Sequence, residues 1–213
     1  WLAQHFRDNG YQAYAVGKMH IQPQRSRLGF DDILLDEEGR CDPDDYEVFL
    51  SDQGYPGQRF AGGMSNNEYP WRAWHLPEPC HVTNWATQQM CRTIRRRDPE
   101  RPAIWYLSYS HPHPPLAPLR EYLEMYRDIP VDAPFYGDWL DEKPDIPEKE
   151  NLRIKGVRRA FYALCTHIDH QLRVVLGTLR MEGVINHTVI VFTSDHGEML
   201  GNHGLWAKRV FFQ

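Results

Sequence analysis

The hydrophobic positions of this sequence alternate between helical and strand-like spacing. Residues 1–9 repeat them at helical spacing, and the short apolar run 11–16 follows, which predicts a helix and then a buried strand. The same order recurs further on, where Thr83 or Asn84 can cap a helix and the apolar run 103–107 predicts the next strand. A helix followed by a strand, repeated along the chain, is typical of an open α/β sheet.

The most regular helical pattern lies in the second half of the chain and ends at Gly183. Its apolar positions advance in steps of three or four residues and are Val157, Phe161, Leu164, Ile168, Leu172, Val175 and Leu179. The run Thr188–Thr193 that follows is apolar throughout, which predicts a strand covered on both faces, as in a parallel sheet. We therefore expect three strands, each preceded by a helix.

Three segments lack a clear period. Residues 31–52 hold ten acidic side chains and one basic side chain, which predicts a solvated loop, and residues 54–80 are rich in Gly, Pro, Asn and Trp. Together they predict an irregular excursion over about 31–82, whose second part is a candidate substrate-facing surface. Residues 128–150 contain four prolines and eight carboxylates, which favours an extended surface connection.

Composition narrows the class of protein. The 213 residues are 41% hydrophobic and 25% charged, enough for a globular core, and the net charge of −5 provides no positive field for a nucleic acid. No apolar run approaches the roughly 20 residues that span a bilayer, so we expect no membrane span. The four cysteines lack metal-site spacing and predict free thiols. The chain starts without Met, so we expect a piece of a longer protein, and the sequence decides neither compartment nor oligomeric state.

Polar clusters follow each predicted strand, at residues 17–20, 110–115 and 194–198. In open α/β sheets, ligands bind beyond the carboxyl ends of the strands. We therefore expect one site that gathers the side chains of Lys18, His20, His113, Asp195, His196 and Lys208.

These residue types indicate a metal site that binds an anion. Asp195 and His196 offer an oxygen and a nitrogen ligand for a divalent cation. Lys18 and Lys208 are two of only five lysines, against nineteen arginines, and lysine suits a compact tetrahedral anion. The plainer alternative for each of these positions is a polar turn or a solvated loop.

Four strings of residues, taken in order, resemble the successive signatures of the type I sulfatases. They are GKMH at 17–20, SHPHP at 110–114, TSDHGE at 193–198 and GNHGLWAK at 201–208. The resemblance covers nearly the whole chain. It implies an alkaline-phosphatase-like three-layer sandwich with a mostly parallel central sheet, of which residues 1–213 form an incomplete, central part.

The resemblance also implies an activity, the metal-dependent hydrolysis of a sulfate monoester. The nucleophile of that family is a formylglycine made from Cys or Ser, whose hydrated aldehyde attacks sulfur and later expels sulfate. Carried over by position, Asp195 and His196 become metal ligands, with Ca²⁺ as the expected ion. Lys18 and Lys208 then hold the sulfate and the nucleophile.

Two histidines take proton-transfer roles in the same carry-over. His20 becomes the base of the sulfate-expulsion step, and His113 protonates or stabilises the leaving oxygen. A positioned imidazole contributes roughly 10²- to 10⁴-fold in rate in such a role. His113 lies among prolines, so a rigid loop residue is its alternative.

The sequence departs from the family pattern at the nucleophile. The string at 41–45, CDPDD, has Asp where the motif needs Arg and lies downstream of residues 17–20, so Cys41 is not expected to be the nucleophile. The acidic pair that completes the metal shell is also absent. We expect the formylglycine and this pair in an upstream segment, so that the 213 residues alone are inactive and the complete protein is active.

Two other functions remain open at this stage. One is a phosphonate monoester hydrolase or phosphodiesterase of the same superfamily, with Mn²⁺ or Zn²⁺ in the metal site. The other is a catalytically silent sulfatase-like module. For an active sulfatase, the expected partner is a small-molecule or carbohydrate sulfate ester.

Overall fold

A parallel sheet of three strands organises the chain. The computed structural model describes residues 1–39, 43–60, 64–138, 144–208 and 210. Within this part, the strand order is β2–β1–β3, with β1 at Gln12–Gly17, β2 at Asp32–Leu35 and β3 at Ala103–Ser108. Both pairings of β1 are parallel, and their registers join Tyr14 to Asp32 and Gln12 to Ala103. The carboxyl ends of all three strands therefore meet at one edge.

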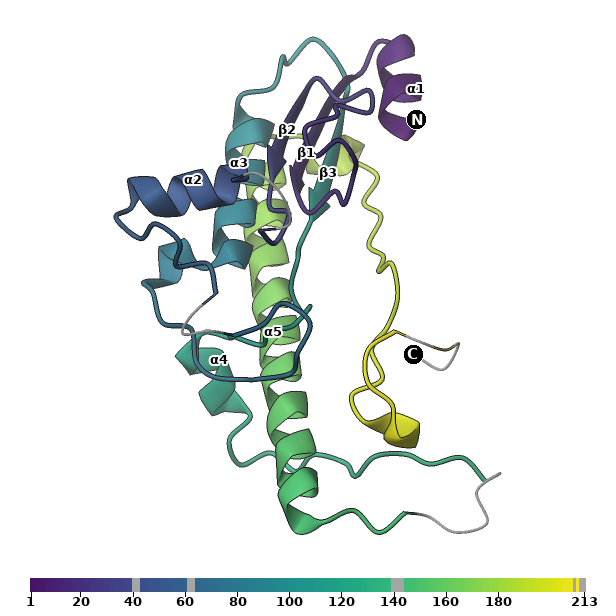
Figure 1. Cartoon of the computed structure of the whole chain (residues 1–213). Helices are drawn as coiled ribbons and strands as arrows, with labels where there is room; N and C mark the ends of the chain where they lie inside the picture. Colours follow the sequence, from purple (N-terminus) through teal and green to yellow (C-terminus); the bar gives the residue numbers. More distant parts are fainter. Residues whose placement is uncertain (40–42, 61–63, 139–143, 209, 211–213) are drawn as a thin grey trace.

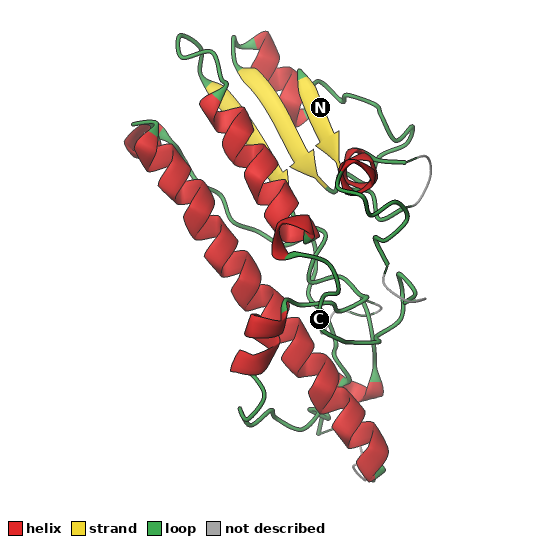
Figure 2. Ribbon diagram, turned by 90° about the vertical axis from the view of Figure 1, so that its left-hand side faces the viewer, coloured by secondary structure: helices red, strands yellow, loops and turns green. Residues whose placement is uncertain are grey.

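Helices cover both faces of this sheet and give three layers (Figures 1 and 2). Helix α1 (Leu2–Asp8) lies on one face, and α3 (Val82–Arg95) lies on the other. The long helix α5 (Glu148–Met181) packs along α3 and extends well beyond the sheet. Helices α2 (Asp45–Asp52) and α4 (Arg120–Met125) flank these two, which gives the α/β sandwich that the sequence predicts.

The main core fills the space between the sheet and its helical layer. Its buried residues come from β1, α2, α3, α5 and the turn before α3, and are Val16, Tyr46, Leu50, Cys80, Val82, Trp85, Ala86, Met90, Ile94 and Leu179. A second cluster lies lower on α5 and joins Leu116, Val157, Ala160, Leu164 and Leu200. Burial of such side chains contributes about 1.5–3 kcal/mol each, so these two clusters fix α5 against the rest of the molecule.

Most predicted elements are confirmed, with shifted ends. Helices α1, α3 and α5 and strands β1 and β3 lie where the periodicity places them. The cap of α3 is His81, whose ring accepts the N–H of Thr83, two to three residues before the predicted position. Helix α5 begins at Glu148, so the last residues of the predicted extended connection are helical.

The prediction of a solvated loop over 31–52 is wrong, because this acidic segment contains both β2 and α2. Four of its carboxylates are buried, at Asp36, Glu37, Glu38 and Asp44. Each one has a partner that replaces water, either a cation or backbone N–H groups. The acidic composition of this segment could not predict its burial, because the partners come from elsewhere in the chain.

The prediction of a strand over Thr188–Thr193 is also wrong in this structure. The segment runs from the end of α5 beside the molecule without joining the sheet (Figures 1 and 2). Val189 and Val191 are 91% and 81% exposed. A strand is stable only beside another strand, and no described strand lies next to this segment.

Two expectations concern cysteines and membranes. Cys80, Cys91 and Cys165 are free thiols, as predicted, whereas Cys41 lies outside the described residues. Among the helices that the structure describes, none combines the length and the apolar character needed to cross a bilayer.

Candidate functional site

Gly17 joins the carboxyl ends of the three strands. It pairs with Leu35 on one side and with Ser108 on the other. Its φ is +104°, and a Cβ at this position would lie 1.8 Å from the carbonyl oxygen of Ser108. Lys18 donates its backbone N–H to that same oxygen at 3.0 Å, and Asp36 donates its N–H to the Gly17 oxygen at 3.1 Å. Only glycine permits this close approach, which brings the loops after β1, β2 and β3 together.

The loop after β1 is held by the side chain of Glu37. Its Oε1 atom accepts the backbone N–H groups of Met19 at 2.7 Å and His20 at 2.8 Å. His20 adopts a left-handed φ of +53°, and its side chain is exposed. The glutamate satisfies two donors that would otherwise face a buried surface, so it fixes the backbone that presents Lys18 and His20.

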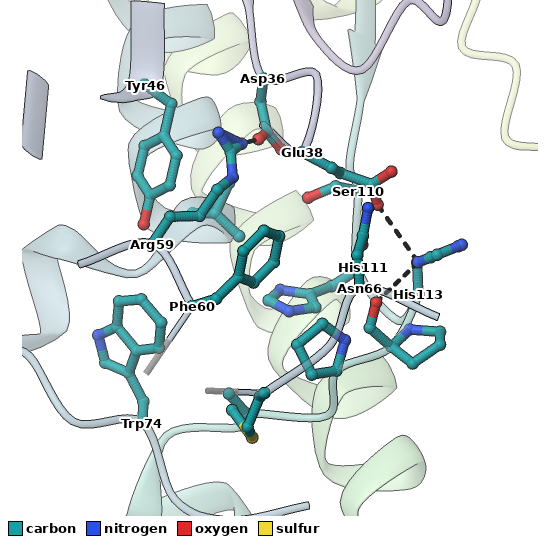
Figure 3. A pocket seen from close by; sticks show the side chains of 15 residues that line it. Asp36, Glu38, Tyr46, Arg59, Phe60, Asn66, Trp74, Ser110, His111 and His113 are labelled. Carbon is teal, nitrogen blue, oxygen red and sulfur yellow. Dashed lines mark hydrogen bonds and ion pairs between the residues drawn. The ribbon is translucent and has the colours of Figure 1, made fainter. Parts of the chain in front are cut away.

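Lys18 and His113 meet at one carboxylate, that of Glu38. The Lys18 Nζ atom lies 3.0 Å from Oε2 of Glu38. The His113 Nδ1 atom lies 3.3 Å from Oε1 of the same carboxylate (Figure 3). All three side chains are largely shielded from solvent, with exposures of 15%, 15% and 6% for Lys18, His113 and Glu38. The structure thus brings two of the predicted site residues together, from the ends of neighbouring strands.

The hydrogen bonds of His113 determine its tautomer. Its Nδ1 atom lies 2.8 Å from the carbonyl oxygen of Pro114. Because a carbonyl oxygen can only accept, Nδ1 carries a proton, and Nε2 is the nitrogen left for a reactant. Burial lowers the pKa of His113, and the nearby charges of Lys18 and Lys208 lower it further, whereas the charge of Glu38 acts in the opposite direction.

Lys208 reaches this region from a segment that is anchored on α5. Arg158 of α5 donates from Nε to the Leu200 oxygen at 3.0 Å and from Nη2 to Oδ1 of Asn202 at 2.7 Å. Trp206 packs on Tyr69, with ring centroids 4.9 Å apart. Lys208 itself is exposed and lies near enough to influence the pKa of His113. Its placement is compatible with the predicted role, which stays a prediction.

Asp195 and His196 lie apart from this group. Within the described part of the chain, they contact each other, at 3.3 Å between Oδ2 and Nε2, and their neighbours Ser194 and Gly197. The Asp195 side chain is 81% exposed. Among the described residues, no cluster of three or more His, Cys, Asp or Glu side chains could hold a metal ion. Ca²⁺ takes about six to eight oxygen ligands, so the residues present do not by themselves fit a calcium site.

A cavity of about 40 Å³ lies behind His113 (Figure 3). Glu38, Ser110 and His111 line one side of it, and the segment 54–80 lines the other with Arg59, Phe60, Met64, Asn66 and Trp74. Apart from the short helix η2 (Glu78–Cys80), the described part of that segment has no helix or strand longer than a single bridge, as predicted. Its aromatic side chains therefore border the predicted catalytic histidine.

Three further imidazoles pack beneath this cavity. The rings of His81 and His111 are 5.0 Å apart, and those of His81 and His167 are 4.7 Å apart. Burial lowers the pKa of His111 to about 3 and that of His167 to about 4. Neutral imidazoles form this layer near neutral pH, and His167 is fully buried within it.

Sequence reasoning missed Gly17, Glu37 and Glu38 as parts of the site. Glu37 and Glu38 lie two and three residues after β2, in the loop beyond the strand, but the sequence predicted no strand there. The number of acidic residues around them concealed the strand.

The chain was compared with known families and proteins. A family model described as Sulfatase matches residues 1–210. An arylsulfatase of Clostridium perfringens is 31% identical and aligns with 100% of this chain and 49% of its own length. A choline-sulfatase of Rhizobium meliloti is 29% identical, over 99% of this chain and 44% of its own length. The chain thus spans about half the length of these curated relatives.

Among solved structures, a phosphonate monoester hydrolase of Agrobacterium radiobacter resembles the chain with a TM-score of 0.75. The match covers 99% of this chain and 50% of that one, at 20% identity, and shows the fold alone. The family match extends over almost every residue and includes all four motifs at the strand exits and in the loop beyond. The chain belongs to the sulfatase family.

Proposed function

We propose that the protein to which this chain belongs is a sulfuric ester hydrolase. Its substrate is a sulfate monoester of a small molecule or a carbohydrate. The observation that carries the proposal is the meeting of Lys18 and His113 at the joined ends of β1 and β3, within a chain of the sulfatase family.

In this proposal, the site's own residues bind the sulfate and manage a proton. The ammonium groups of Lys18 and Lys208 attract the sulfate oxygens, and a compact point charge suits a tetrahedral group. The ester S–O bond breaks as a nucleophile of the complete protein forms its own bond to sulfur, and the leaving oxygen takes a proton from Nε2 of the His113 imidazolium. His20, exposed at the same edge, receives the base role. Their placement beyond the strand ends supports these roles.

Two components of the proposal come from the family resemblance. A divalent cation, Ca²⁺ first, is proposed at Asp195 and His196, with further ligands from elsewhere in the protein. A formylglycine outside residues 1–213 is proposed as the nucleophile. Its hydrated aldehyde would supply the attacking oxygen. The described residues alone do not complete a site for the cation.

The test is a paired assay of the complete protein. An aryl sulfate and an aryl phosphonate monoester are offered separately, before and after treatment with a chelator, and the metal content is measured. We expect the sulfate to be hydrolysed with the higher kcat/KM and the rate to fall when metal is removed.

The alternative functions correspond to the other outcomes of this assay. Cleavage of the phosphonate with no action on the sulfate would replace the proposal by a phosphonate monoester hydrolase, for which Mn²⁺ or Zn²⁺ is expected. Inertness toward both, in a protein shown to be folded, would identify a silent module.

A further inference from the structure

Glu38 occupies an unusual position for an acidic residue, because it is buried between an ammonium group and an imidazole ring. Its side chain is 6% exposed, and each of its carboxylate oxygens faces a different partner. Oε2 lies 3.0 Å from the ammonium of Lys18, and Oε1 lies 3.3 Å from Nδ1 of His113. One carboxylate therefore sets the separation between a group that binds sulfate and a group that donates a proton.

The two residues that precede Glu38 are both held by contacts with other parts of the chain. Glu37 donates its N–H to Oδ2 of Asp44 at 2.6 Å, and the preceding Asp36 pairs with the guanidinium of Arg59. Glu38 itself takes a left-handed φ of +58°. Non-glycine residues adopt this conformation uncommonly, and here it coincides with a side chain directed at Lys18 and His113. The carboxylate is thus placed by several independent contacts.

We propose that Glu38 is a positioning residue of the hydrolytic site. Its carboxylate lies 3.3 Å from Nδ1 of His113, beside the hydrogen bond of Nδ1 to the Pro114 oxygen, and it stabilises the imidazolium so that Nε2 is directed at the leaving oxygen. The same carboxylate holds the ammonium of Lys18 beside it. This inference rests on the proposed function, because the leaving oxygen belongs to the sulfate ester.

The charges around His113 explain why such a residue is needed. The charges of Lys18 and Lys208 act on the imidazole and lower its pKa, and the ring of His111 lines the same cavity. Arg59 lies across that cavity, paired with Asp36 and Asp44. Among these groups, Glu38 is the carboxylate in contact with the His113 ring. It stabilises the imidazolium, which is the form that can donate a proton from Nε2.

The test uses Glu38→Gln in the complete protein, because the amide keeps the shape and removes the charge. An opposite charge at this distance changes the midpoint of a titration by roughly one to three pH units. We expect the basic limb of the kcat/KM profile, and the His113 titration followed by NMR, to move down by that amount. At pH values above that limb, the rate then falls about tenfold for each pH unit by which the limb moves. An unchanged His113 titration in the folded variant would overturn the proposal.

A second variant keeps the test independent of how well Glu38→Gln folds. Lys18→Met removes a cation that faces His113, so the His113 titration should move up, opposite in sign to the first variant. The control is Glu182→Gln, which removes the carboxylate of the remote Arg97–Glu182 ion pair and should leave the titration unchanged. If the midpoint of the His113 titration moves down or does not move in Lys18→Met, the proposed arrangement of Lys18, Glu38 and His113 is contradicted.

The two proposals fail in different ways. If the unmodified protein cleaves no sulfate ester while the NMR titrations move as described, the proposed function is wrong and the charge bridge stands. If the protein is an active sulfatase and the His113 titration is the same in Glu38→Gln as in the unmodified protein, the positioning role is wrong.

Discussion

The ends of β1 and β3 differ sharply from the segment 188–197. In each region an apolar run is followed by a polar motif. Lys18 and His113 are held by paired strands and by a buried carboxylate. In contrast, Val189 is 91% exposed, and within the described chain Asp195 contacts only its neighbours in sequence. The local sequence signal is of the same kind in the two regions, so it does not explain the difference.

What separates the two regions is the presence of a neighbouring strand. At Gly17 the backbone bonds of three strands converge, and the polar loops follow from that geometry. The run 188–193 has the composition of a strand covered on both faces but no described partner to supply its hydrogen bonds. The comparison teaches that a motif becomes a site only where its strand is paired.

The largest effect is expected from His113→Ala in the complete protein. Loss of a positioned imidazole should lower kcat/KM for an aryl sulfate by roughly 10²- to 10⁴-fold. His187→Ala, at an exposed histidine of η3 (Ile185–His187), is the matched control and should leave kcat/KM unchanged. If kcat/KM falls equally in both variants, the position of His113 after β3 has no specific importance for the reaction.

Gly17→Ala tests whether the close approach of β1 to β3 positions the site. The added Cβ overlaps the Ser108 carbonyl, so we expect the free energy of unfolding to fall by about 3 kcal/mol, at the upper end for overpacking. Gly10 has a similar φ of +87°, but an added Cβ there would have nothing within 4 Å. Gly10→Ala therefore measures the cost of the backbone conformation without the steric overlap. Denaturant unfolding of the two variants measures the difference. Equal losses would mean that the close approach itself contributes nothing.

The buried imidazoles predict a dependence of stability on pH. His167 has a pKa of about 4 in the folded chain, below the usual 6.5, so the unfolded chain binds its proton first as the pH falls. Stability is fully present above about pH 6.5 and is lost at about 1.4 kcal/mol per pH unit for each such histidine until the pH reaches the folded pKa.

The test compares His167→Gln with the unmodified chain in urea at about pH 7.5 and about pH 5. The variant should lose about 2 kcal/mol less between these two values, because one titrating group is gone. Groups titrating in both proteins, such as Asp44, whose pKa burial raises to about 6, cancel in the comparison. An identical loss in the variant would show that the pKa of His167 is the same in the folded and unfolded chains.

The smallest effect is expected at Val191. Since its side chain is 81% exposed, Val191→Ala should change the stability of this chain by no more than about 0.5 kcal/mol. Val16→Ala, at a position that is 1% exposed, should cost roughly 2 kcal/mol. Repeating the pair in the complete protein sharpens the comparison, because a large cost at Val191 there would reveal a strand partner outside these residues.

The sequence by itself determined most of the elements and the family. The periodicity of α1, α3 and α5 and the apolar runs of β1 and β3 are local properties, and local spacing is enough to identify them. The four motifs likewise identify a sulfatase without coordinates. Lys18 and His113 were predictable as neighbours, because parallel strands end at the same edge of a sheet.

Only the tertiary structure decided which acidic residues are buried and which apolar residues are exposed. Glu38 lies between Lys18 and His113, residues that are 95 positions apart in the chain, so no local pattern could reveal the contact. The exposure of Val191 depends equally on a neighbouring strand that its own sequence does not encode. Charge burial and strand pairing are set by partners distant in sequence, and those partners are known only once the chain is folded.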